Sequence, residues 1–567
     1  MFIAVKLHAL SLRVHITALL IAIFVWSAPS AAAQSRFEGM VVADDELAAR
    51  AGMEMLKRGG NAVDAAVATA FALAVVDPAS SGIGGGGFMV IYQAREKTAH
   101  VLDFRERAPS AIHRDLYIKG GKVVAGLSLT GGLAVAVPSE VMGLSEALKR
   151  FGTVPLSTVM APAIRYASEG FPLQGHLRYA VERQLANIRK SPGLARVFLR
   201  SDGTPYDVGE KIAQTELGET LSAIARQGPQ VFYEGSIAQA IVEGVKKEGG
   251  VMTLEDLKTY RPVWREPLLG QYRKHLVISM PPPSSGGIAL LEMLRVLESY
   301  RLDQLVHNSA TYLHLMAEAM KHAFADRAQY LGDPDFVQIP TAKLLSKERA
   351  DKIRGKISPA RTYGPEFYGP ISVQPEKGGT THFSVLDGAG NAVACTVTIN
   401  TRFGSKVVAP GTGIILNNEI DDFSIQSGTP NTYGLIGVEA NAIQPKKRPL
   451  SSMTPTIIIE NDRPVLIVGG AGGPRIINAV LQTILNVLDF RMPVDKAVEA
   501  ARIHHQWVPN ELSVELGIPA ETRLSLERRG HALRERDGLG VVQALVAKNG
   551  KVSGKADPRK EERGGGQ

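Results

Sequence analysis

The spacing of apolar residues along the chain changes between two periods, and each period predicts a different kind of element. In 44–76 apolar residues recur every three or four positions behind an acidic start, a spacing typical of a helix. The range 138–330 has the same helical character over most of its length, and two strong amphipathic helices are expected within 290–330. Residues 88–92 follow a glycine-rich stretch, are apolar throughout and predict a strand.

A strand pattern dominates the chain after residue 380. Residues 380–387 and 392–399 alternate like strands, and the turn-forming sequence 388–391 separates them, so the pair predicts a β-hairpin. Further strands are expected at 456–459 and 465–468. The helix and strand patterns together indicate a protein that mixes the two, with no internal repeat of fixed period.

The segment 353–379 differs in composition from both of its neighbours. It is rich in Gly, Pro, Ser and Lys and ends in Gly378-Gly379, directly before Thr380. This composition is typical of an exposed linker. A threonine at the start of a strand is most often structural, so the position of Thr380 alone does not indicate a function.

Composition and charge narrow the class of protein. The 567 residues are 45% hydrophobic and carry charges of both signs along their length, so a large core can form. The 64 basic and 56 acidic residues leave a net charge of +8, but the excess is not gathered into a basic stripe with interleaved aromatic residues. Nucleic acid is therefore not expected as a partner.

Residues 1–33 have the pattern of an export signal. Lys6 and Arg13 precede the apolar run 16–26, and small residues ending at Ala33 follow it, so cleavage after Ala33 is expected. The apolar run is shorter than the roughly 20 residues that cross a bilayer. No stable membrane span is expected, and an uncleaved anchor is the less favoured alternative. The mature protein is expected in the periplasm or outside the cell.

Three other patterns resemble ligand or redox sites but favour structural roles. The glycine run 82–87 fits a dinucleotide fingerprint, yet it precedes a strand instead of a helix. His314, His322 and Asp326 lie on predicted helices without the spacing of a metal site. Cys395 is the only cysteine, so no intrachain disulfide can form, and its predicted strand favours a buried apolar role. No metal or cofactor is expected.

Six short motifs follow one another along nearly the whole chain after the signal. They are Gly84–Gly87, Asp103-Phe104-Arg105-Glu106, Thr380-Thr381-His382, Asn417–Phe423, Arg448–Met453 and Gly472-Gly473. This ordered set resembles the gamma-glutamyltransferase family. The resemblance implies an α+β fold, a four-layer αββα sandwich of the N-terminal nucleophile hydrolase type. It also implies self-cleavage into a large fragment, 34–379, and a small fragment, 380–567, that fold as one composite domain.

By this resemblance Thr380 is the catalytic nucleophile. A threonine hydroxyl is a weak nucleophile and needs a nearby base. Cleavage before Thr380 would supply one, because a free α-amine titrates at roughly 7.7 to 8 and can accept the hydroxyl proton. The same hydroxyl could first attack the Gly379 carbonyl and cut the chain itself. Thr398, on the partner strand of the predicted hairpin, resembles the family threonine that orients the nucleophile.

A glycine-rich stretch, 469–473, precedes the predicted helix 476–488. Backbone N–H groups in such a stretch can approach a carbonyl oxygen closely and stabilise negative charge on it. Gly472 and Gly473 resemble the oxyanion hole of the family. A phosphate-binding loop is the competing interpretation, but no Gly-Lys-Ser/Thr follows. A purely structural turn stays open.

The resemblance also assigns a site for the head group of an amino-acid substrate. Arg105 would bind the α-carboxylate in a forked pair, assisted by the hydroxyls of Ser451 and Ser452. The α-ammonium would be held by Glu419, Asp422 and the side-chain amide of Asn400. The stretch 430–434 resembles the lid loop of the family, with Tyr433 as the covering side chain. Arg402 is bulkier and more basic than expected so close to the pocket.

The expected reaction runs through a glutamyl ester on Thr380, resolved by water or by the amine of an amino acid or short peptide. Glutathione and other γ-glutamyl compounds are the expected donors. Two alternatives stay open: a cephalosporin acylase of the same superfamily, which removes a glutaryl group, and a non-catalytic periplasmic binder of glutamyl compounds. Retention of Glu419, Asp422 and the lid stretch argues against the acylase. Thr380 directly after Gly378-Gly379 argues against the binder.

Overall fold

Two antiparallel six-stranded sheets pack against each other in the computed structural model, which describes residues 39–369, 379–426 and 439–560. All of these residues belong to one unit, Phe37–Gln567. The first sheet has the order β1 (Met40–Ala43), β11 (Thr381–Leu386), β12 (Ala392–Thr398), β2 (Gly86–Gln93), β3 (Thr98–Phe104) and β8 (Val263–Arg265). The second has the order β19 (Lys551–Ala556), β18 (Val541–Lys548), β14 (Arg463–Ala471), β13 (Thr456–Glu460), β10 (His275–Ser279) and β9 (Leu268–Tyr272).

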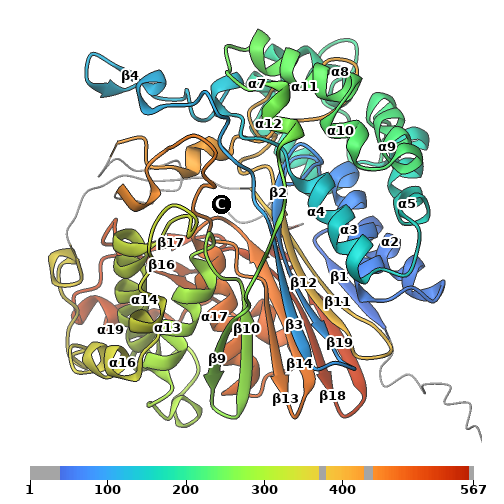
Figure 1. Ribbon diagram of the computed structural model, residues 1–567. Coiled ribbons are helices and arrows are strands. Elements are labelled where there is room, and N and C mark those ends of the chain that lie inside the picture. The colour runs from blue at the N-terminus through green and yellow to red at the C-terminus, as the bar shows by residue number, and fades with distance from the viewer. Residues whose placement is uncertain (1–38, 370–378, 427–438, 561–567) are drawn as a thin grey trace, which may run out of the picture. The chain divides into compact units, whose positions relative to one another are not determined.

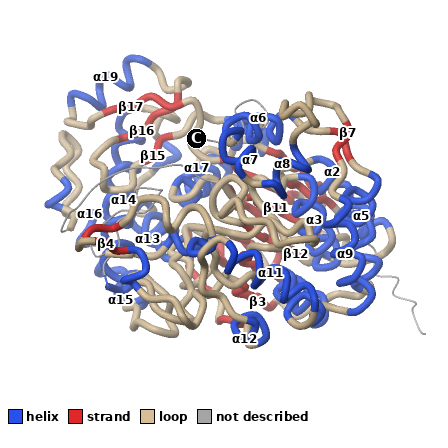
Figure 2. The backbone as a smooth tube through the Cα atoms, turned by 90° about the horizontal axis from the view of Figure 1, so that it is seen from above, coloured by secondary structure: helices blue, strands red, loops and turns tan. Residues whose placement is uncertain are grey.

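Helices cover the outer face of each sheet (Figures 1 and 2). On the first sheet, α3 contacts β11 and β12, and α4 contacts β2 and β3; on the second, α17 contacts β14 and β18. The helices on the first sheet are α2 (Glu46–Lys57), α3 (Ala62–Val76), α4 (Glu140–Phe151) and α5 (Leu156–Glu169), and those on the second include α13 (Gly286–Leu297), α14 (Ala310–Tyr330) and α17 (Arg475–Leu488). The predicted four-layer αββα sandwich is confirmed.

The remaining elements extend these helical layers. In the first half of the chain they are α6 (Gly175–Arg183), α7 (Leu185–Lys190), α8 (Pro192–Phe198), α9 (Thr215–Gln227), α10 (Gln230–Tyr233), α11 (Ser236–Lys247) and α12 (Leu254–Lys258). Later come α15 (Thr341–Leu344), α16 (Lys347–Arg354), α18 (Val494–Glu499), α19 (Ala520–Arg528) and the small sheet β15 (Ile503–His504), β16 (Leu512–Glu515) and β17 (Leu533–Arg536). Two short pairs, β4 (Ile118–Lys119) with β5 (Lys122–Val123) and β6 (Phe171–Pro172) with β7 (Lys211–Ile212), complete the strands.

Alternate side chains of the inner strands serve two different cores. In β2, Met89 and Ile91 pack with the helices α2 and α3, whereas Phe88, Val90 and Tyr92 belong to the core shared with the second sheet. This follows from the two-residue period of a strand, and it is why 88–92 is apolar on both faces.

Strands from both sides of the Gly379–Thr380 bond are interleaved in the first sheet and adjacent in the second. In the first sheet β11 and β12 lie between β1 and β2, with Met40 opposite Leu386 and Gly86 opposite Thr398. In the second sheet β10 pairs with β13. Residues before and after this bond therefore share the same hydrogen-bonded ladders.

The local predictions hold at most positions and fail at two. The hairpin, the strands near 456–468, the helix that begins at Arg475 and the buried Cys395 are confirmed. The single helix expected over 44–76 is wrong, because Gly59, with φ of +86°, and Gly60 end α2, and Asn61 caps the separate helix α3. The expectation of mainly helix over 138–330 missed β8, β9 and β10, which are three to five residues long.

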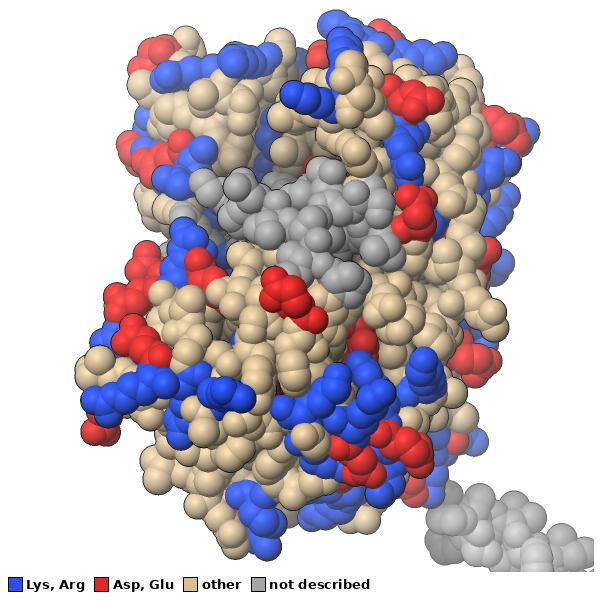
Figure 3. Space-filling view, turned by 90° about the vertical axis from the view of Figure 1, so that its left-hand side faces the viewer, with Lys and Arg blue, Asp and Glu red and all other residues tan. Residues whose placement is uncertain are grey.

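On the face drawn in Figure 3, Lys and Arg side chains lie among Asp and Glu side chains. No described helix combines the length and the apolar character needed to cross a bilayer. The predicted signal, 1–33, lies outside the described residues.

Candidate active site

One pocket brings together residues that are far apart in the sequence. It forms where β3, β11, β12 and β14 begin or end near the Gly379–Thr380 bond. Nine of the predicted site residues line it: Arg105, Thr380, Thr398, Asn400, Glu419, Asp422, Ser451, Ser452 and Gly473. Leu450, Met453 and Ile476 supply apolar wall. The predicted lid residue Tyr433 lies outside the described residues.

Thr380 precedes the first residue of β11 and is buried. Its Oγ1 lies 3.2 Å from Oγ1 of Thr398 and donates to the carbonyl oxygen of Gly379. Thr398 Oγ1 also accepts the backbone N–H of Asn400 at 2.8 Å. The two hydroxyls are thus within hydrogen-bond distance of each other, and the Asn400 N–H holds the Thr398 oxygen in place. The neighbouring threonine thus orients the hydroxyl beside the bond that it is expected to attack.

The loop after β14 forms a second wall. Gly472 and Gly473 have φ of +123° and +60°, backbone conformations that glycine adopts readily, and α17 begins two residues later at Arg475. A Cβ atom on Gly472 would lie 3.1 Å from Cα of Gly540. Glycine is therefore required at Gly472 both by the backbone angle and by the close approach of the chain at Gly540.

Arg105 is engaged by carboxylates of the protein itself. Its Nη1 lies 2.6 Å from Oε2 of Glu419, and its Nη2 lies 2.5 Å from Oδ2 of Asp422. Nε donates to the Pro449 carbonyl at 3.2 Å. A guanidinium has five N–H groups, so these three contacts leave two for a further acceptor. The sequence did not predict that the residue expected to bind the substrate carboxylate would also pair with those expected to bind its ammonium.

Burial shifts the ionisation of the carboxyls around Arg105. It raises the pKa of Glu106 to about 8 and the pKa of Glu419 well above its usual range, with Arg105 opposing both shifts. Burial also raises the pKa of Asp422, again against Arg105. Apart from their ion pairs with Arg105, the carboxyl oxygens of Glu106 and Glu419 have no hydrogen-bond partner among the described residues. The pocket therefore has unused capacity to accept hydrogen bonds, as expected for a site that receives an ammonium group.

Ser451 and Ser452 are held by a segment that lies far away in the sequence. Ser285 donates its hydroxyl to the Ser451 carbonyl at 2.7 Å, and Ser451 Oγ accepts the N–H of Met453. Arg327, on α14, donates from Nη2 to Ser452 Oγ at 3.4 Å and from Nε to Ser285 Oγ at 2.9 Å. No sequence pattern marks Arg327 as a site residue, because it is one polar position on a predicted amphipathic helix.

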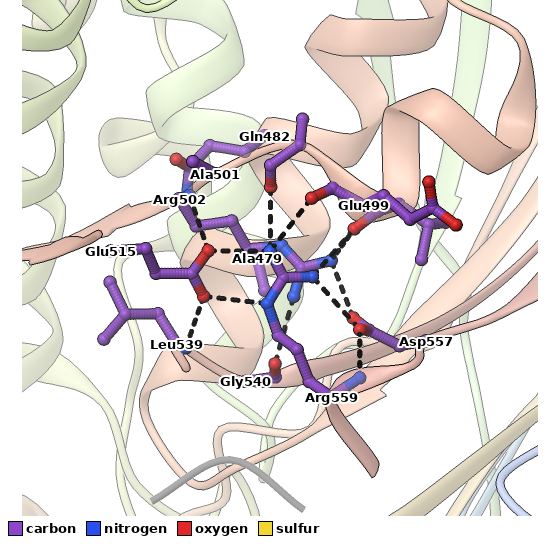
Figure 4. Close-up of polar contacts among 12 residues, drawn as sticks. Ala479, Gln482, Glu499, Ala501, Arg502, Glu515, Leu539, Gly540, Asp557 and Arg559 are labelled. Atoms are coloured by element: carbon purple, nitrogen blue, oxygen red, sulfur yellow. Dashed lines mark hydrogen bonds and ion pairs between the residues drawn. The ribbon is translucent and has the colours of Figure 1, made fainter. Parts of the chain in front are cut away.

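A cluster of four charged side chains near the C-terminal strands supports the Gly472 loop (Figure 4). Arg502 lies 2.8 Å from Asp557 and donates to the Gly540 carbonyl at 3.0 Å, while Arg559 lies 2.6 Å from Glu515. Glu515 accepts the N–H of Leu539, and Asp557 accepts the N–H of Val542. We call Arg502, Glu515, Asp557 and Arg559 the C-terminal cluster; it fixes the backbone against which Gly472 packs.

Among the described residues, His314, Glu318 and His531 are the group that could hold a metal ion, with ligand atoms within 4.8 Å of one another. His314 bonds to His531 at 2.8 Å and to the Ser358 carbonyl at 2.7 Å. Lys321 lies 3.6 Å from Glu318. These contacts already occupy the group, in agreement with the hydrogen-bonded role expected for His314.

Arg402 stacks its guanidinium over the ring of Tyr179, 5.5 Å from its centroid.

Comparison with solved structures identifies the class of fold. The cephalosporin acylase from Bacillus halodurans is similar over 93% of this chain and 95% of its own, with a TM-score of 0.80 and 31% identity. The Helicobacter pylori gamma-glutamyltranspeptidase is similar over 57% of this chain and 93% of its own, with a TM-score of 0.56 and 40% identity. The sandwich is thus that of an N-terminal nucleophile hydrolase.

Comparison of sequences identifies the family. The family model described as Gamma-glutamyltranspeptidase matches residues 48–566. The glutathione hydrolase proenzyme of Escherichia coli K12 is 42% identical over 525 residues, which cover 92% of this chain and 90% of the relative. The glutathione hydrolase proenzyme of Bacillus subtilis 168 is 38% identical over 540 residues, 92% of this chain and 90% of the relative. The chain belongs to the gamma-glutamyltranspeptidase family.

Proposed function

We propose that this protein is a self-processing γ-glutamyltransferase and glutathione hydrolase with Thr380 as its nucleophile. The observation that carries the proposal is the single pocket in which Thr380 lies with Arg105, Glu419 and Asp422. A glutamyl head group carries one carboxylate and one ammonium, and the pocket offers groups of opposite charge for both. The names of the relatives, glutathione hydrolase proenzymes, support the same donor and a precursor form.

Maturation begins with attack of Thr380 Oγ1 on the Gly379 carbonyl carbon. The peptide bond breaks, and hydrolysis of the resulting ester leaves a large fragment, 34–379, and a small fragment, 380–567, folded as one composite domain. The new α-amine of Thr380 then serves as the base for its own hydroxyl. Interleaving of β11 and β12 between β1 and β2 supports a cut that leaves the fold intact.

In the catalytic cycle, Thr380 attacks the γ-carbonyl of the donor. Backbone N–H groups of Gly472 and Gly473 stabilise the oxyanion, and the leaving amine departs with a proton. The glutamyl ester is then resolved by water, which gives glutamate, or by the amine of an amino acid or dipeptide. Thr398 keeps the attacking oxygen oriented throughout, as its 3.2 Å contact with Thr380 supports.

The head group binds by completing an alternating pattern of charges. Its α-carboxylate takes the two remaining N–H groups of Arg105 and the hydroxyls of Ser451 and Ser452. Its α-ammonium lies between Glu419 and Asp422, with the amide of Asn400 beside them. Binding therefore adds partners to Arg105 without breaking its ion pairs with the two carboxylates.

The cephalosporin acylase alternative is supported by the fold similarity to the Bacillus halodurans enzyme. A glutaryl donor has no ammonium, so it would leave Glu419 and Asp422 facing a methylene group, which is costly for buried carboxylates. The carboxylate pair therefore favours a glutamyl donor. Export to the periplasm or the outside is part of the proposal and depends on the signal pattern of 1–33.

The decisive experiment compares a γ-glutamyl anilide with the matching glutaryl anilide, each with and without a dipeptide acceptor. We expect release of the aniline from the γ-glutamyl compound only, faster with the acceptor. Equal release from both donors would replace the proposal by the acylase. No release from either, with an uncut chain on a denaturing gel, would favour the non-catalytic binder.

A further inference from the structure

Arg327 is a buried arginine without an acidic partner. It lies on α14 with 4% of its surface exposed. Its contacts are two serine hydroxyls, Ser285 and Ser452. The nearest acids in sequence and in space pair with other arginines: Asp326 with Arg349 and Asp422 with Arg105. Within the described residues, no ion pair involves Arg327.

An unpaired buried charge is expensive, and proteins rarely retain one without a reason. Burial lowers the pKa of Arg327 to about 10, with Asp422 opposing the shift, so the guanidinium stays charged at neutral pH. Its two serine contacts satisfy hydrogen bonds but not the charge. Asp422 compensates this charge only in part, because it pairs with Arg105, so a further anion can be accommodated near Arg327.

The position of Arg327 shows where that anion would lie. Ser452 accepts from Arg327 and lines the pocket. Because its oxygen accepts from Arg327, its proton is available to an acceptor on the pocket side. Ser285, the other partner, gives its own proton to the Ser451 carbonyl. Arg327 is thus separated from the pocket by one hydroxyl group.

The sum of the charges around the pocket also favours a ligand with a carboxylate. When Glu419 and Asp422 are both ionised and Glu106, whose pKa burial raises to about 8, is protonated, Arg105 alone leaves the pocket with a net negative charge, which repels a carboxylate. Arg327 brings the balance to zero, so a head group with one carboxylate and one ammonium fits a neutral pocket. Without Arg327 the pocket would suit a simple ammonium better than an amino acid.

We propose that Arg327 is a positioning residue that makes the pocket select ligands with an α-carboxylate, acting through the Ser452 hydroxyl and through its charge. This inference depends on the proposed function, because it concerns the same pocket. It predicts that L-glutamate and 4-aminobutyrate, which differ by the α-carboxylate alone, respond differently to loss of Arg327. Direct binding separates the inference from catalysis.

The test measures binding of both compounds by calorimetry to wild type, Arg327→Met and Arg327→Lys. We expect Arg327→Met to lower the binding affinity for L-glutamate by about 10- to 100-fold and the affinity for 4-aminobutyrate by less than about 3-fold. The affinities of Arg327→Lys should lie between those of the wild type and Arg327→Met. Arg349→Met, which removes a neighbouring arginine paired with Asp326 outside the pocket, is the matched control and should change neither affinity. If Arg327→Met does not fold, the contrast between the two ligands is read from Arg327→Lys and from Ser452→Ala.

Equal losses for both compounds, or an unchanged L-glutamate affinity in a folded variant, would overturn the inference. Turnover of the γ-glutamyl anilide by the wild type is measured in parallel with the binding experiments. Glutamate binding that needs Arg327 without any turnover would support the inference and reject the proposed catalysis. Turnover in Arg327→Met with an unchanged KM would support the proposed catalysis and reject the inference about Arg327.

Discussion

Two buried clusters of charged residues in this protein differ in how many hydrogen-bond donors surround their carboxylates. In the C-terminal cluster each of the four carboxylate oxygens of Glu515 and Asp557 has a hydrogen-bond donor. In the pocket cluster, which we define as Arg105, Glu106, Glu419 and Asp422, the oxygens of Glu106 and Glu419 have ion pairs with Arg105 but no hydrogen-bond donor besides it among the described residues. A satisfied cluster stabilises the fold, whereas an unsatisfied one lowers stability and leaves capacity for a ligand.

The comparison predicts that substitutions in the pocket change activity with little loss of stability and that substitutions in the C-terminal cluster do the opposite. Thr380→Ala is the extreme case on the pocket side. It removes the hydroxyl for both the cut and the reaction, so we expect one uncut chain and a loss of kcat of about 10⁶. The uncut Thr380→Ala chain should still fold, because the substitution removes only a hydroxyl and a methyl group at the pocket. A denaturing gel and N-terminal sequencing check the cut; two fragments formed by Thr380→Ala alone would contradict self-cleavage.

The next effect concerns donor choice. A site that pairs with a polar group rejects an analogue lacking it by about 10⁴ to 10⁵, so the wild type should strongly prefer γ-glutamyl over glutaryl anilides. Asp422→Ala should lower γ-glutamyl turnover and narrow that ratio while the chain is still cut. Asp421→Ala is the matched control, because Asp421 bonds to Ser128 and does not line the pocket. A ratio that is the same in Asp422→Ala as in the wild type would place the ammonium site elsewhere.

Arg502→Met tests the C-terminal cluster. Removing Arg502 leaves two buried carboxylates, Glu515 and Asp557, with Arg559 as their remaining counter-charge, which costs about 3 to 5 kcal/mol of unfolding free energy. The control is Arg301→Met, whose pair with Asp303 is 66% and 37% exposed and should contribute little to stability because solvent screens it. Urea unfolding in a Thr380→Ala background, where the chain stays whole, gives both values. If Arg502→Met and Arg301→Met lower the unfolding free energy equally, the C-terminal cluster does not have the stabilising role assigned to it.

Arg105→Lys should weaken substrate binding because lysine keeps the charge but loses the planar fork. We expect KM for a γ-glutamyl anilide to rise by about 10- to 100-fold with smaller change in kcat. The cut before Thr380 should still occur. A correctly processed Arg105→Lys protein with an unchanged specificity constant would remove Arg105 from the site.

The smallest expected effect is a change in the pH dependence of stability. Burial raises the pKa of Glu106 from 4.5 to about 8. The folded protein therefore binds a proton that the unfolded chain has lost, and the stability from Glu106 is complete below pH 4.5 and lost as the pH rises through about 8. In Glu106→Gln the unfolding free energy should fall less steeply between pH 5 and pH 8. The unfolding free energy is measured by urea titration at each pH. If its pH dependence is the same in Glu106→Gln as in the wild type, Glu106 is not the source of that dependence.

The sequence could predict features set by local pattern but not those set by distant contacts. The hairpin around 388–391 follows from alternation and a turn, and the glycines at 472 and 473 follow from their place before a helix. The strands β8 to β10 are too short to show a period. The C-terminal cluster joins residues up to 57 positions apart, from Arg502 to Arg559, and nothing local marks them. Arg327 shows only as one polar position on a helix that is buried on all sides.

The interleaved order β1, β11, β12, β2 changes how the protein relates to its own unfolded state. Before the cut, folding is a unimolecular event, because all four strands belong to one chain. After the cut, the strands of the small fragment must find those of the large fragment by diffusion, so recovery from unfolding depends on concentration. The folded form is then maintained by slow unfolding instead of by refolding. In the exported and cut form that we propose, diluted fragments would not reassociate, so each molecule would fold only once.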